Sequence, residues 1–403
     1  MSKIDVKNIS KDELIKELVR IGEKPYRATQ IFRWLYKACP VPERSERCGT
    51  PVNSFDEMTD LNKTLREKLK GKFHITKIVA LDSKRSLIDG TTKYLLKLED
   101  SHTIEAVFLP EEERTTLCLS SQVGCKFGCS FCASAQFGFV RNLKASEILD
   151  EVLFIREHNK GRPVPVALHP NEMDGTGLRY RAGAITNIVF MGIGEPLDNY
   201  NNVIRAIRIL NDEDAFNIGA RKITISTCGI IPGMEKLAGE KMQIELSVSL
   251  HSPDDKIRSK LVPINKRYPL NELIAACRDY TGQTKRIITF EYILIKGVNA
   301  SEGDAFKLAK LLTGLNCKVN LISYNQINPV RNLKISNGIK AKGYEAPSTE
   351  GVKDFFRTLK SRGINVMLRK SKGEDIDAGC GQLRISKLRT PPILKLYRVY
   401  IRR

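Results

Sequence analysis

Three cysteines lie close together on one short stretch of the chain, in the run Cys125-Lys-Phe-Gly-Cys-Ser-Phe-Cys132. The spacing places the thiolates of Cys125, Cys129 and Cys132 where one compact inorganic group could bind all of them. A cubane iron–sulfur cluster held by three cysteines keeps one iron without a protein ligand, whereas electron-transfer and structural zinc sites fill every position with side chains. The run therefore predicts a cluster that can still bind a small molecule.

A zinc site is the competing interpretation of these thiols. Structural zinc sites are usually built from two Cys-x-x-Cys pairs, or from one such pair and two histidines, and the sequence contains no second set of this kind. We therefore favour iron, and a zinc knuckle with a distant fourth ligand is the alternative. The remaining cysteines outside the proposed chemistry, which we interpret as structural or incidental, are Cys39, Cys48, Cys228, Cys277 and Cys317.

The cysteine spacing, with the aromatic Phe131 directly before the last cysteine, resembles the signature of the radical S-adenosylmethionine (SAM) enzymes. This resemblance implies a [4Fe-4S] cluster whose free iron chelates the amino and carboxylate groups of SAM. It also implies that one electron from the cluster cleaves SAM to a 5′-deoxyadenosyl radical.

Composition predicts a reduced compartment and a polyanionic partner. The chain has 66 Lys+Arg against 46 Asp+Glu, a formal charge of +20, which suggests binding to a phosphate backbone. The N-terminus lacks the apolar stretch of a signal peptide, and no apolar run approaches the length of a membrane span, so we expect a cytoplasmic protein. Basic residues gather in 381–403, and an acid-free run before Cys380 contains Arg362, Arg369, Lys370 and Lys372.

The order of sequence patterns predicts four regions. Residues 1–75 show helical periodicity over 12–21, 26–36 and 62–70, and we expect a small helical accessory domain that binds RNA, with a packing appendage as the alternative. Residues 76–110 alternate with period two and predict an antiparallel strand extension. We expect the catalytic core over 111–385 and a basic tail over 386–403.

In the core, apolar strand-like runs alternate with helical stretches. We predict strands at 115–119, 185–191, 222–226, 245–250, 289–295, 319–323 and 365–368. About six βα units predict an α/β fold, a partial (βα)6-type barrel with its active site at the C-terminal ends of the strands.

Residues suited to bind a cofactor follow four of these strands. They are Gly194 and Glu195, then Ser226, then Ser249, Leu250 and His251, and finally Asn325. Glycines let the backbone approach a ligand, a glutamate can pair with an ammonium group, and the Ser, His and Asn side chains offer hydrogen bonds. Each position alone is a weak signal, because glycine turns and structural histidines are common. Their shared location predicts one cofactor site.

The motifs together resemble the RlmN/Cfr family of radical SAM RNA adenine methyltransferases. The resemblance covers most of the chain and depends on the runs Thr116-Leu-Cys-Leu-Ser-Ser-Gln-Val-Gly-Cys125, Met191-Gly-Ile-Gly-Glu-Pro-Leu197, Ser226-Thr-Cys-Gly229, Ser249-Leu-His251 and Gly373-Glu-Asp-Ile-Asp-Ala-Gly-Cys-Gly-Gln-Leu383. It implies methylation of adenosine 2503 of 23S rRNA, and for some members of adenosine 37 of transfer RNA. We favour carbon 2 of the adenine, with Cfr-like methylation of carbon 8 as the alternative. Residues 159–184 and 329–347 look like surface insertions in the family pattern.

The resemblance assigns roles to two further cysteines and one acid. One SAM methylates Cys380, and a second SAM generates the radical that removes a hydrogen from this methyl group, so two SAM molecules are used per turnover. The methylene radical adds to the ring carbon, Cys118 then attacks Cys380 to form a disulfide, and Glu105 accepts a proton. Without the resemblance, Cys118 on its apolar strand would be interpreted as a packing residue, whereas Cys380 lies in a stretch that we expect to be flexible and exposed.

The sequence also leads to expectations about the partners of the chain and about two rival functions. We expect an RNA substrate, an electron donor such as flavodoxin, and a monomeric enzyme. A methylthiotransferase would normally need additional cluster cysteines, which the sequence does not contain as a second motif. A zinc-dependent RNA-binding protein would leave the strand-end motifs and Cys380 without a role.

Overall fold

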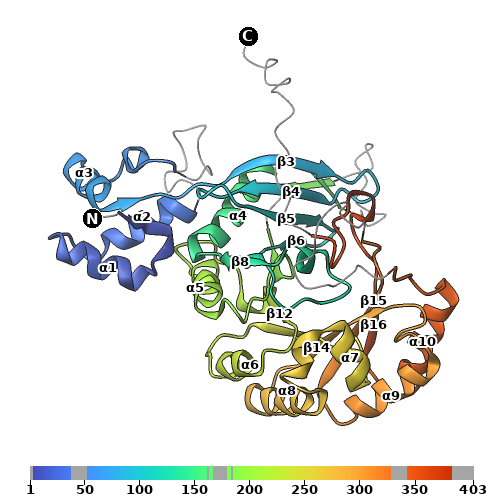
Figure 1. Ribbon diagram of the computed structural model, residues 1–403. Helices are drawn as coiled ribbons and strands as arrows, with labels where there is room; N and C mark the ends of the chain where they lie inside the picture. The colour runs from blue at the N-terminus through green and yellow to red at the C-terminus, as the bar shows by residue number, and fades with distance from the viewer. Residues whose placement is uncertain are drawn as a thin grey trace.

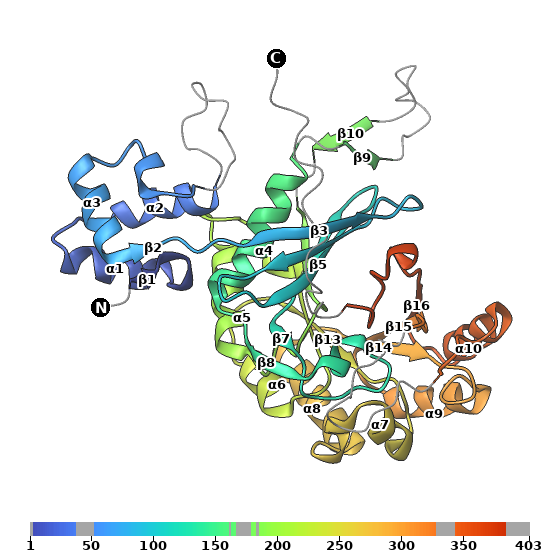
Figure 2. The same ribbon diagram turned by 45° about the horizontal axis from the view of Figure 1, so that its top comes forward.

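The computed structural model describes residues 3–37, 52–160, 163–166, 179–182, 185–327 and 343–383. Figures 1 and 2 show a large twisted sheet with helices around it and a separate group of N-terminal helices at one side. Cys39, Cys48, the predicted tail 386–403 and most of the two predicted insertions lie outside the described residues.

The N-terminal region is helical, and its three predicted helices are confirmed. It contains β1 (Ile4–Asp5), α1 (Lys11–Arg20), α2 (Arg27–Tyr36), α3 (Lys63–Lys72) and β2 (Phe73–His74). The capping box of α1 is present, because the Ser10 side chain accepts from the Glu13 backbone N–H and the Glu13 side chain accepts from the Ser10 backbone N–H. Leu14 and Leu18, one helical turn apart, are buried in the core.

Polar contacts attach this helical region to the rest of the chain. The buried Lys7 ammonium is paired with Asp150 on α4 (Ala145–His158) and donates to the carbonyl oxygen of Thr76 at 2.6 Å. Asp214, after α5 (Tyr200–Asn211), accepts from Arg33 at 3.0 Å and is also paired with Lys11. A buried ion pair with several partners fixes geometry more than it adds stability, so these contacts set the orientation of the helices on the core.

One ten-stranded sheet forms the centre of the molecule, in the order β16-β15-β14-β13-β12-β11-β6-β5-β4-β3. Seven neighbouring strands are parallel: β6 (Thr115–Cys118), β11 (Asn187–Phe190), β12 (Ile223–Thr227), β13 (Glu245–Ser249), β14 (Ile288–Leu294), β15 (Cys317–Ser323) and β16 (Val366–Arg369). Among the described strands, β16 and β3 are the open edges, so the barrel is partial. Each of the seven strands predicted in the core matches one of these parallel strands, and the prediction is confirmed.

The other three strands extend the sheet with antiparallel pairing. They are β3 (Val79–Arg85), β4 (Thr92–Lys97) and β5 (Thr103–Pro110), and β5 pairs with β6 so that Val107 lies opposite Cys118. The extension thus continues the sheet on the side of β6 that the other parallel strands leave free.

Helices cover the outside of the parallel strands, as Figure 1 shows. After α4 and α5 they are α6 (Ile231–Ala238), α7 (Asp255–Leu261), α8 (Leu270–Thr284), α9 (Glu302–Leu312) and α10 (Thr349–Ser361). On α10, Val352, Phe355 and Leu359 recur at helical spacing and are buried against the sheet side. No helix in the described part of the chain has the length and apolarity that a membrane crossing needs.

The segment after β16, residues 370–383, folds back toward the antiparallel extension (Figure 2). Its Gly373 N–H donates to Asp89 at 2.9 Å, and the carbonyl oxygen of Asp377 accepts from Lys93 at 2.9 Å. Farther along, the carbonyl oxygen of Gly381 accepts from the Ala133 N–H at 2.7 Å. The expectation of an exposed position is wrong for Cys380, which is only partly exposed. Hydrogen bonds to the antiparallel extension and to the cysteine loop hold the segment in place.

Candidate active site

The cysteine loop lies between β7 (Gln122–Gly124) and β8 (Phe139–Asn142), which pair with each other and close the loop at its base. The Cys125 N–H donates to the carbonyl oxygen of Gly138 at 2.9 Å, and the Cys132 N–H donates to that of Cys129 at 3.1 Å. Three glycines at or within the ends of this loop have positive φ, Gly124, Gly128 and Gly138, a conformation that a side chain would disfavour. The loop is therefore wound so that its three thiols converge on one space.

The donor set of this loop fits a cubane cluster. Cys125, Cys129 and Cys132 are free thiols that line one cavity. In a cubane each of three cysteines binds a different iron and the fourth iron stays open. Burial raises the pKa of Cys125 to about 12, so ligation would have to displace its proton.

A central cavity of about 140 Å³ lies between this loop and the C-terminal ends of the parallel strands. Most of the predicted cofactor-binding residues line it together with the cysteines: Gly194, Glu195, Ser226, Ser249 and His251. The convergence of residues from β11, β12 and β13 confirms that these strand ends meet at one place.

Two glycines let the backbone after β11 pass close to the start of the cysteine loop. A Cβ atom at Gly192 would lie 2.6 Å from the carbonyl oxygen of Leu119, and one at Gly194 would lie 2.6 Å from Cβ of Gln122. Gly194 also has φ +103°, a conformation that side chains rarely adopt. Both positions require glycine for packing and shape, and only Gly194 was predicted as a site residue.

Glu195 presents a buried carboxylate to the central cavity. Its Oε2 accepts from the Cys228 N–H at 2.7 Å, and its Oε1 accepts from the Leu197 N–H at 3.0 Å. Burial raises the pKa of Glu195, and these backbone donors act in the opposite direction. A carboxylate fixed by two backbone donors is suited to receive an ammonium group of a ligand.

His251 is a neutral hydrogen-bond donor at the edge of the same cavity. Its Nδ1 accepts from the Ile293 N–H at 3.1 Å, so the neutral ring carries its proton on Nε2. Burial lowers the pKa of His251 to about 3, with Arg258 a further cause, which keeps the ring uncharged at neutral pH. Its backbone φ of +57° is unusual for this residue type, and its ring packs edge-on against Phe131 at 4.5 Å between centroids.

Two predicted cofactor residues do not line the central cavity. Leu250 is fully buried, and its backbone N–H donates to the carbonyl oxygen of Glu291 on the next strand at 3.1 Å. Asn325 donates from its side-chain amide to the carbonyl oxygen of Cys380 at 3.3 Å. In this structure Asn325 therefore positions the segment that contains Cys380.

Cys118 and Cys380 share a second, smaller space of about 30 Å³, which we call the thiol pocket. Val107, Leu109 and Met191 supply much of its apolar wall. Cys380 lines both the thiol pocket and the central cavity. Met191 and Ile322 also line both spaces, but Cys380 is the cysteine that the two spaces share.

Glu105, the third predicted catalytic residue, lines neither space. It is buried on β5, and its carboxylate is paired with Lys93 at 3.5 Å. Glu105 is two residues before Val107, and alternate residues of a strand face the same side of a sheet. Because Val107 lines the thiol pocket, Glu105 lies on the same face of the sheet as this pocket, two residues before Val107 on β5.

The structure adds two charged residues that the sequence did not assign to the site. Glu291 on β14 lines the central cavity, and its Oε2 has no hydrogen-bond partner among the described residues. Arg369, at the end of β16, lines the thiol pocket. The sequence signal for Glu291 was an acid inside the apolar run Ile288–Leu294, because charged residues are almost never fully buried unless they are paired. Cys228, interpreted as incidental, also lines the central cavity.

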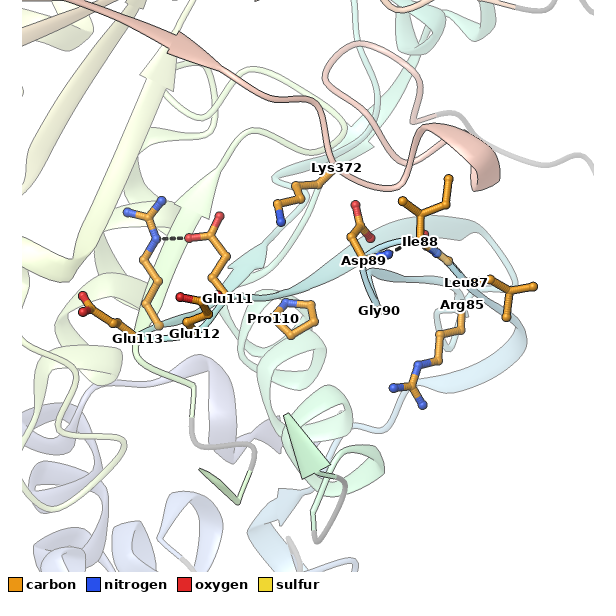
Figure 3. Close-up of a pocket in the computed structure, with 12 residues that line it drawn as sticks. Arg85, Leu87, Ile88, Asp89, Gly90, Pro110, Glu111, Glu112, Glu113 and Lys372 are labelled. Carbon is orange, nitrogen blue, oxygen red and sulfur yellow. Dashed lines mark hydrogen bonds and ion pairs between the residues drawn. The ribbon is translucent and has the colours of Figure 1, made fainter. Parts of the chain in front are cut away.

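A larger outer pocket of about 950 Å³ lies next to the thiol pocket (Figure 3). Its walls are the turn between β3 and β4, the turn between β5 and β6, and Lys372, a residue that also lines the thiol pocket. At the turn between β3 and β4, Leu87 is 98% exposed and Ile88 is 80% exposed. On the other wall Glu111, Glu112 and Glu113 follow β5, and Arg114 is paired with Glu111.

Comparisons with known proteins give two matching family models. The model of the Radical SAM superfamily matches residues 119–309, which contain the cysteine loop and the strand ends of the central cavity. A model described as the ribosomal RNA large subunit methyltransferase N-terminal domain matches residues 4–75, the N-terminal helical region.

Relatives match over nearly the whole chain. A protein of Alkaliphilus oremlandii, named a probable dual-specificity RNA methyltransferase RlmN, is 42% identical over 384 residues, 95% of this chain and 98% of the relative. A protein of the same name from Bacillus velezensis is 42% identical over 373 residues, 93% of this chain and 91% of its own length. The crystal structure of a radical SAM methyltransferase from Sphaerobacter thermophilus superposes with a TM-score of 0.78 at 40% identity, over 94% of this chain and 99% of that one.

Proposed function

Because the chain belongs to the RlmN family of radical SAM RNA methyltransferases, we propose that it methylates carbon 2 of adenosine 2503 in 23S rRNA and of adenosine 37 in transfer RNA. The observation that carries the proposal is the position of Cys380, which lines both the central cavity and the thiol pocket. A residue in that place can receive a group on one side and present it to a substrate on the other. Membership in this family also sets aside the methylthiotransferase and zinc-protein alternatives.

The central cavity supports binding of the cluster and SAM. When bound, a [4Fe-4S] cluster held by Cys125, Cys129 and Cys132 supplies the electron that cleaves SAM. Glu195 would hold the ammonium group of SAM, and Ser226, Ser249 and the Nε2–H of His251 would bind its polar groups. The neutral His251 suits this role, because it can donate a hydrogen bond without bringing a second positive charge to the sulfonium.

The thiol pocket supports the methyl-transfer steps. We propose that the Cys380 sulfur accepts a methyl group from a first SAM, and that this methyl group loses one hydrogen atom when a second SAM is used. After the methylene carbon has bonded to the ring, the ring hydrogen leaves as a proton, and the remaining unpaired electron would return to the bound cluster. Glu105, on the same face of β5 as Val107, is the proposed acceptor, directly or through Cys118. Cys118 and Cys380 lie in one pocket, which supports their final joining as a disulfide.

The outer pocket supports an approach path for RNA. A base stacked inside an RNA helix cannot reach a thiol in so small a space, so the target adenosine must be turned out of its stack. The exposed apolar tip at Leu87 and Ile88 is suited to pack against unstacked bases beside it. Lys372 lies where the outer pocket meets the thiol pocket and could pair with a neighbouring phosphate.

The proposal also covers the regions of the chain, its location and its electron donor. We propose that residues 1–75 act as an RNA-binding accessory region, with 76–110 as the strand extension, 111–385 as the catalytic core and 386–403 as a basic tail. We further propose a cytoplasmic monomer that receives electrons from a flavodoxin-like donor. The N-terminal match to a ribosomal RNA methyltransferase domain supports the RNA-binding role.

Two measurements test the proposed function. Anaerobically purified protein should contain about four iron atoms and four sulfides per chain, whereas one zinc would contradict it. Expression in a strain that lacks its own enzyme should restore 2-methyladenosine in digests of 23S rRNA and transfer RNA, detected by mass spectrometry. Detection of 8-methyladenosine instead would establish the Cfr-like alternative.

A further inference from the structure

Arg369 lines the thiol pocket, a position that the sequence did not predict. As one of the basic residues before Cys380, it was a candidate for contact with RNA phosphate. The structure instead directs its side chain into the thiol pocket, where its Nη1 donates to the sulfur of Met191 at 3.7 Å. Lys370, the next residue, is exposed.

The surroundings of Cys118 create a chemical requirement. Cys118 packs with Val107, Ile193, Ala378 and Leu383, an apolar group. Burial raises the pKa of Cys118 to about 12, whereas the reactive form of cysteine is the thiolate. A buried thiol that must attack a sulfur atom therefore needs a nearby positive charge or hydrogen-bond donors.

Two groups on the opposite wall of the pocket meet this requirement. The Met191 backbone and the Arg369 guanidinium both oppose the effect of burial on the pKa of Cys118. Arg369 also donates from its side chain to the Met191 sulfur at 3.7 Å. Arg369 therefore lies in one pocket with both reactive sulfurs.

We propose that Arg369 is a positioning residue that holds Cys118 in its thiolate form against Cys380 while the protein–RNA bond is broken; this inference rests on the proposed function. In that step the Cys118 thiolate attacks the Cys380 sulfur, a sulfur–sulfur bond forms, and the bond from Cys380 to the methylene carbon breaks. The electron pair of the broken bond goes to the methylene carbon, which takes up one proton and becomes the methyl group. No external oxidant is needed.

Other charged groups around the pair define the electrostatic setting. Glu151 on α4 acts on Cys118 in the direction that raises its pKa. Cys380, Glu291 on β14, Cys118 and Glu111 in the turn after β5 all raise the pKa of Arg369. Lys372 lines the same pocket from the segment after β16. Arginine suits this place, since its guanidinium stays charged and offers several donors at once, which a lysine cannot match.

The experiment compares Arg369→Met and Arg369→Lys in the full chain with its cluster reconstituted. We expect Arg369→Met to keep its iron and its 5′-deoxyadenosine formation but to accumulate a covalent protein–RNA species on denaturing gels. Release of methylated RNA should slow roughly ten- to a hundredfold at neutral pH, because fewer Cys118 thiols are ionised. The rate should then recover by about tenfold per pH unit as pH rises and more of these thiols lose their proton. Arg369→Lys should recover part of the rate.

The control is Arg357→Met, which removes an exposed arginine paired with Glu350 and Asp354 on α10, and it should release RNA at the normal rate. The inference is overturned if Arg369→Met releases RNA at the wild-type rate or with an unchanged pH profile. It is also overturned if both Arg369 variants lose iron, since Arg369 would then act on the cluster site. If Cys118→Ala traps no adduct, the proposed function itself fails; if only Arg369→Met traps none, the inference alone fails.

Discussion

The central cavity and the thiol pocket are neighbours built in different ways. The central cavity is formed by the ends of adjacent parallel strands, β11 to β14, and by a loop closed at its base by the β7–β8 pairing. The thiol pocket joins β6 and β11 to a segment far later in the sequence, 370–383, that is held mainly by single hydrogen bonds. Cofactor binding thus uses the packed sheet, whereas Cys380, the proposed methyl carrier, lies on a separate segment that returns to the sheet.

This difference suits the two tasks. A cofactor that must be oriented for electron transfer benefits from residues fixed by a packed sheet. In the proposed mechanism Cys380 faces the central cavity in one step and Cys118 in another, and a segment outside the sheet suits this better than a strand. The comparison predicts that changes in the first region abolish radical chemistry, and that changes in the second affect only the later transfer and release of the methyl group.

The largest effect should come from Cys129→Ala. Loss of one of three thiolates should prevent cluster assembly, so iron content, the brown colour and 5′-deoxyadenosine formation should all disappear. Cys277→Ala, which removes a buried cysteine of α8 that lines neither space, should retain all three. A Cys129→Ala protein that keeps its iron and cleaves SAM would show that the central cavity is assigned wrongly.

A smaller effect is expected from Gly379→Ala. Its new Cβ would lie 2.6 Å from Nδ2 of Asn325 and 2.8 Å from Oε1 of Gln382, so these two side chains, which hold the segment that carries Cys380, must shift. A displacement of about 1 Å at a reacting group can slow catalysis up to about a hundredfold, while iron content should stay normal. The matched control is Gly282→Ala on α8, where no atom lies within 4 Å of the added Cβ. Equal methylation rates in both variants would contradict this role of the segment.

The smallest effect is expected at Lys370, which is exposed, whereas its neighbour Arg369 lines the thiol pocket. Exposed Lys370 remains a candidate for a phosphate contact, so Lys370→Met should lower RNA affinity a fewfold and reduce the slope of log affinity against log salt by about one. Lys353→Met, which removes an exposed lysine paired with Glu350 on α10, should leave the slope unchanged. Filter-binding titrations at several salt concentrations measure both. An unchanged slope for Lys370→Met would remove this residue from the RNA-binding surface.

The sequence predicted the strand-end residues well for a physical reason. Ser226, Ser249 and Glu195 follow apolar strands, and parallel strands that follow one another in the chain usually bring their carboxyl ends to the same edge. No such rule places Arg369, because its neighbours in space come from β6, β11 and a returning segment. The same holds for Asn325, whose partner is the backbone of Cys380. Local patterns predict elements and their ends, whereas long-range loop contacts need the structure.

The most direct test of the division between the two regions compares Cys118→Ala with Cys380→Ala, each with intact cluster and substrate RNA. Both variants should contain normal iron. Cys118→Ala should accumulate a nuclease-sensitive protein–RNA adduct, and peptide mass spectrometry should map the modified residue to Cys380. Cys380→Ala should form no adduct. Normal turnover by Cys118→Ala, or an adduct at Cys228 or Cys317, would contradict the account.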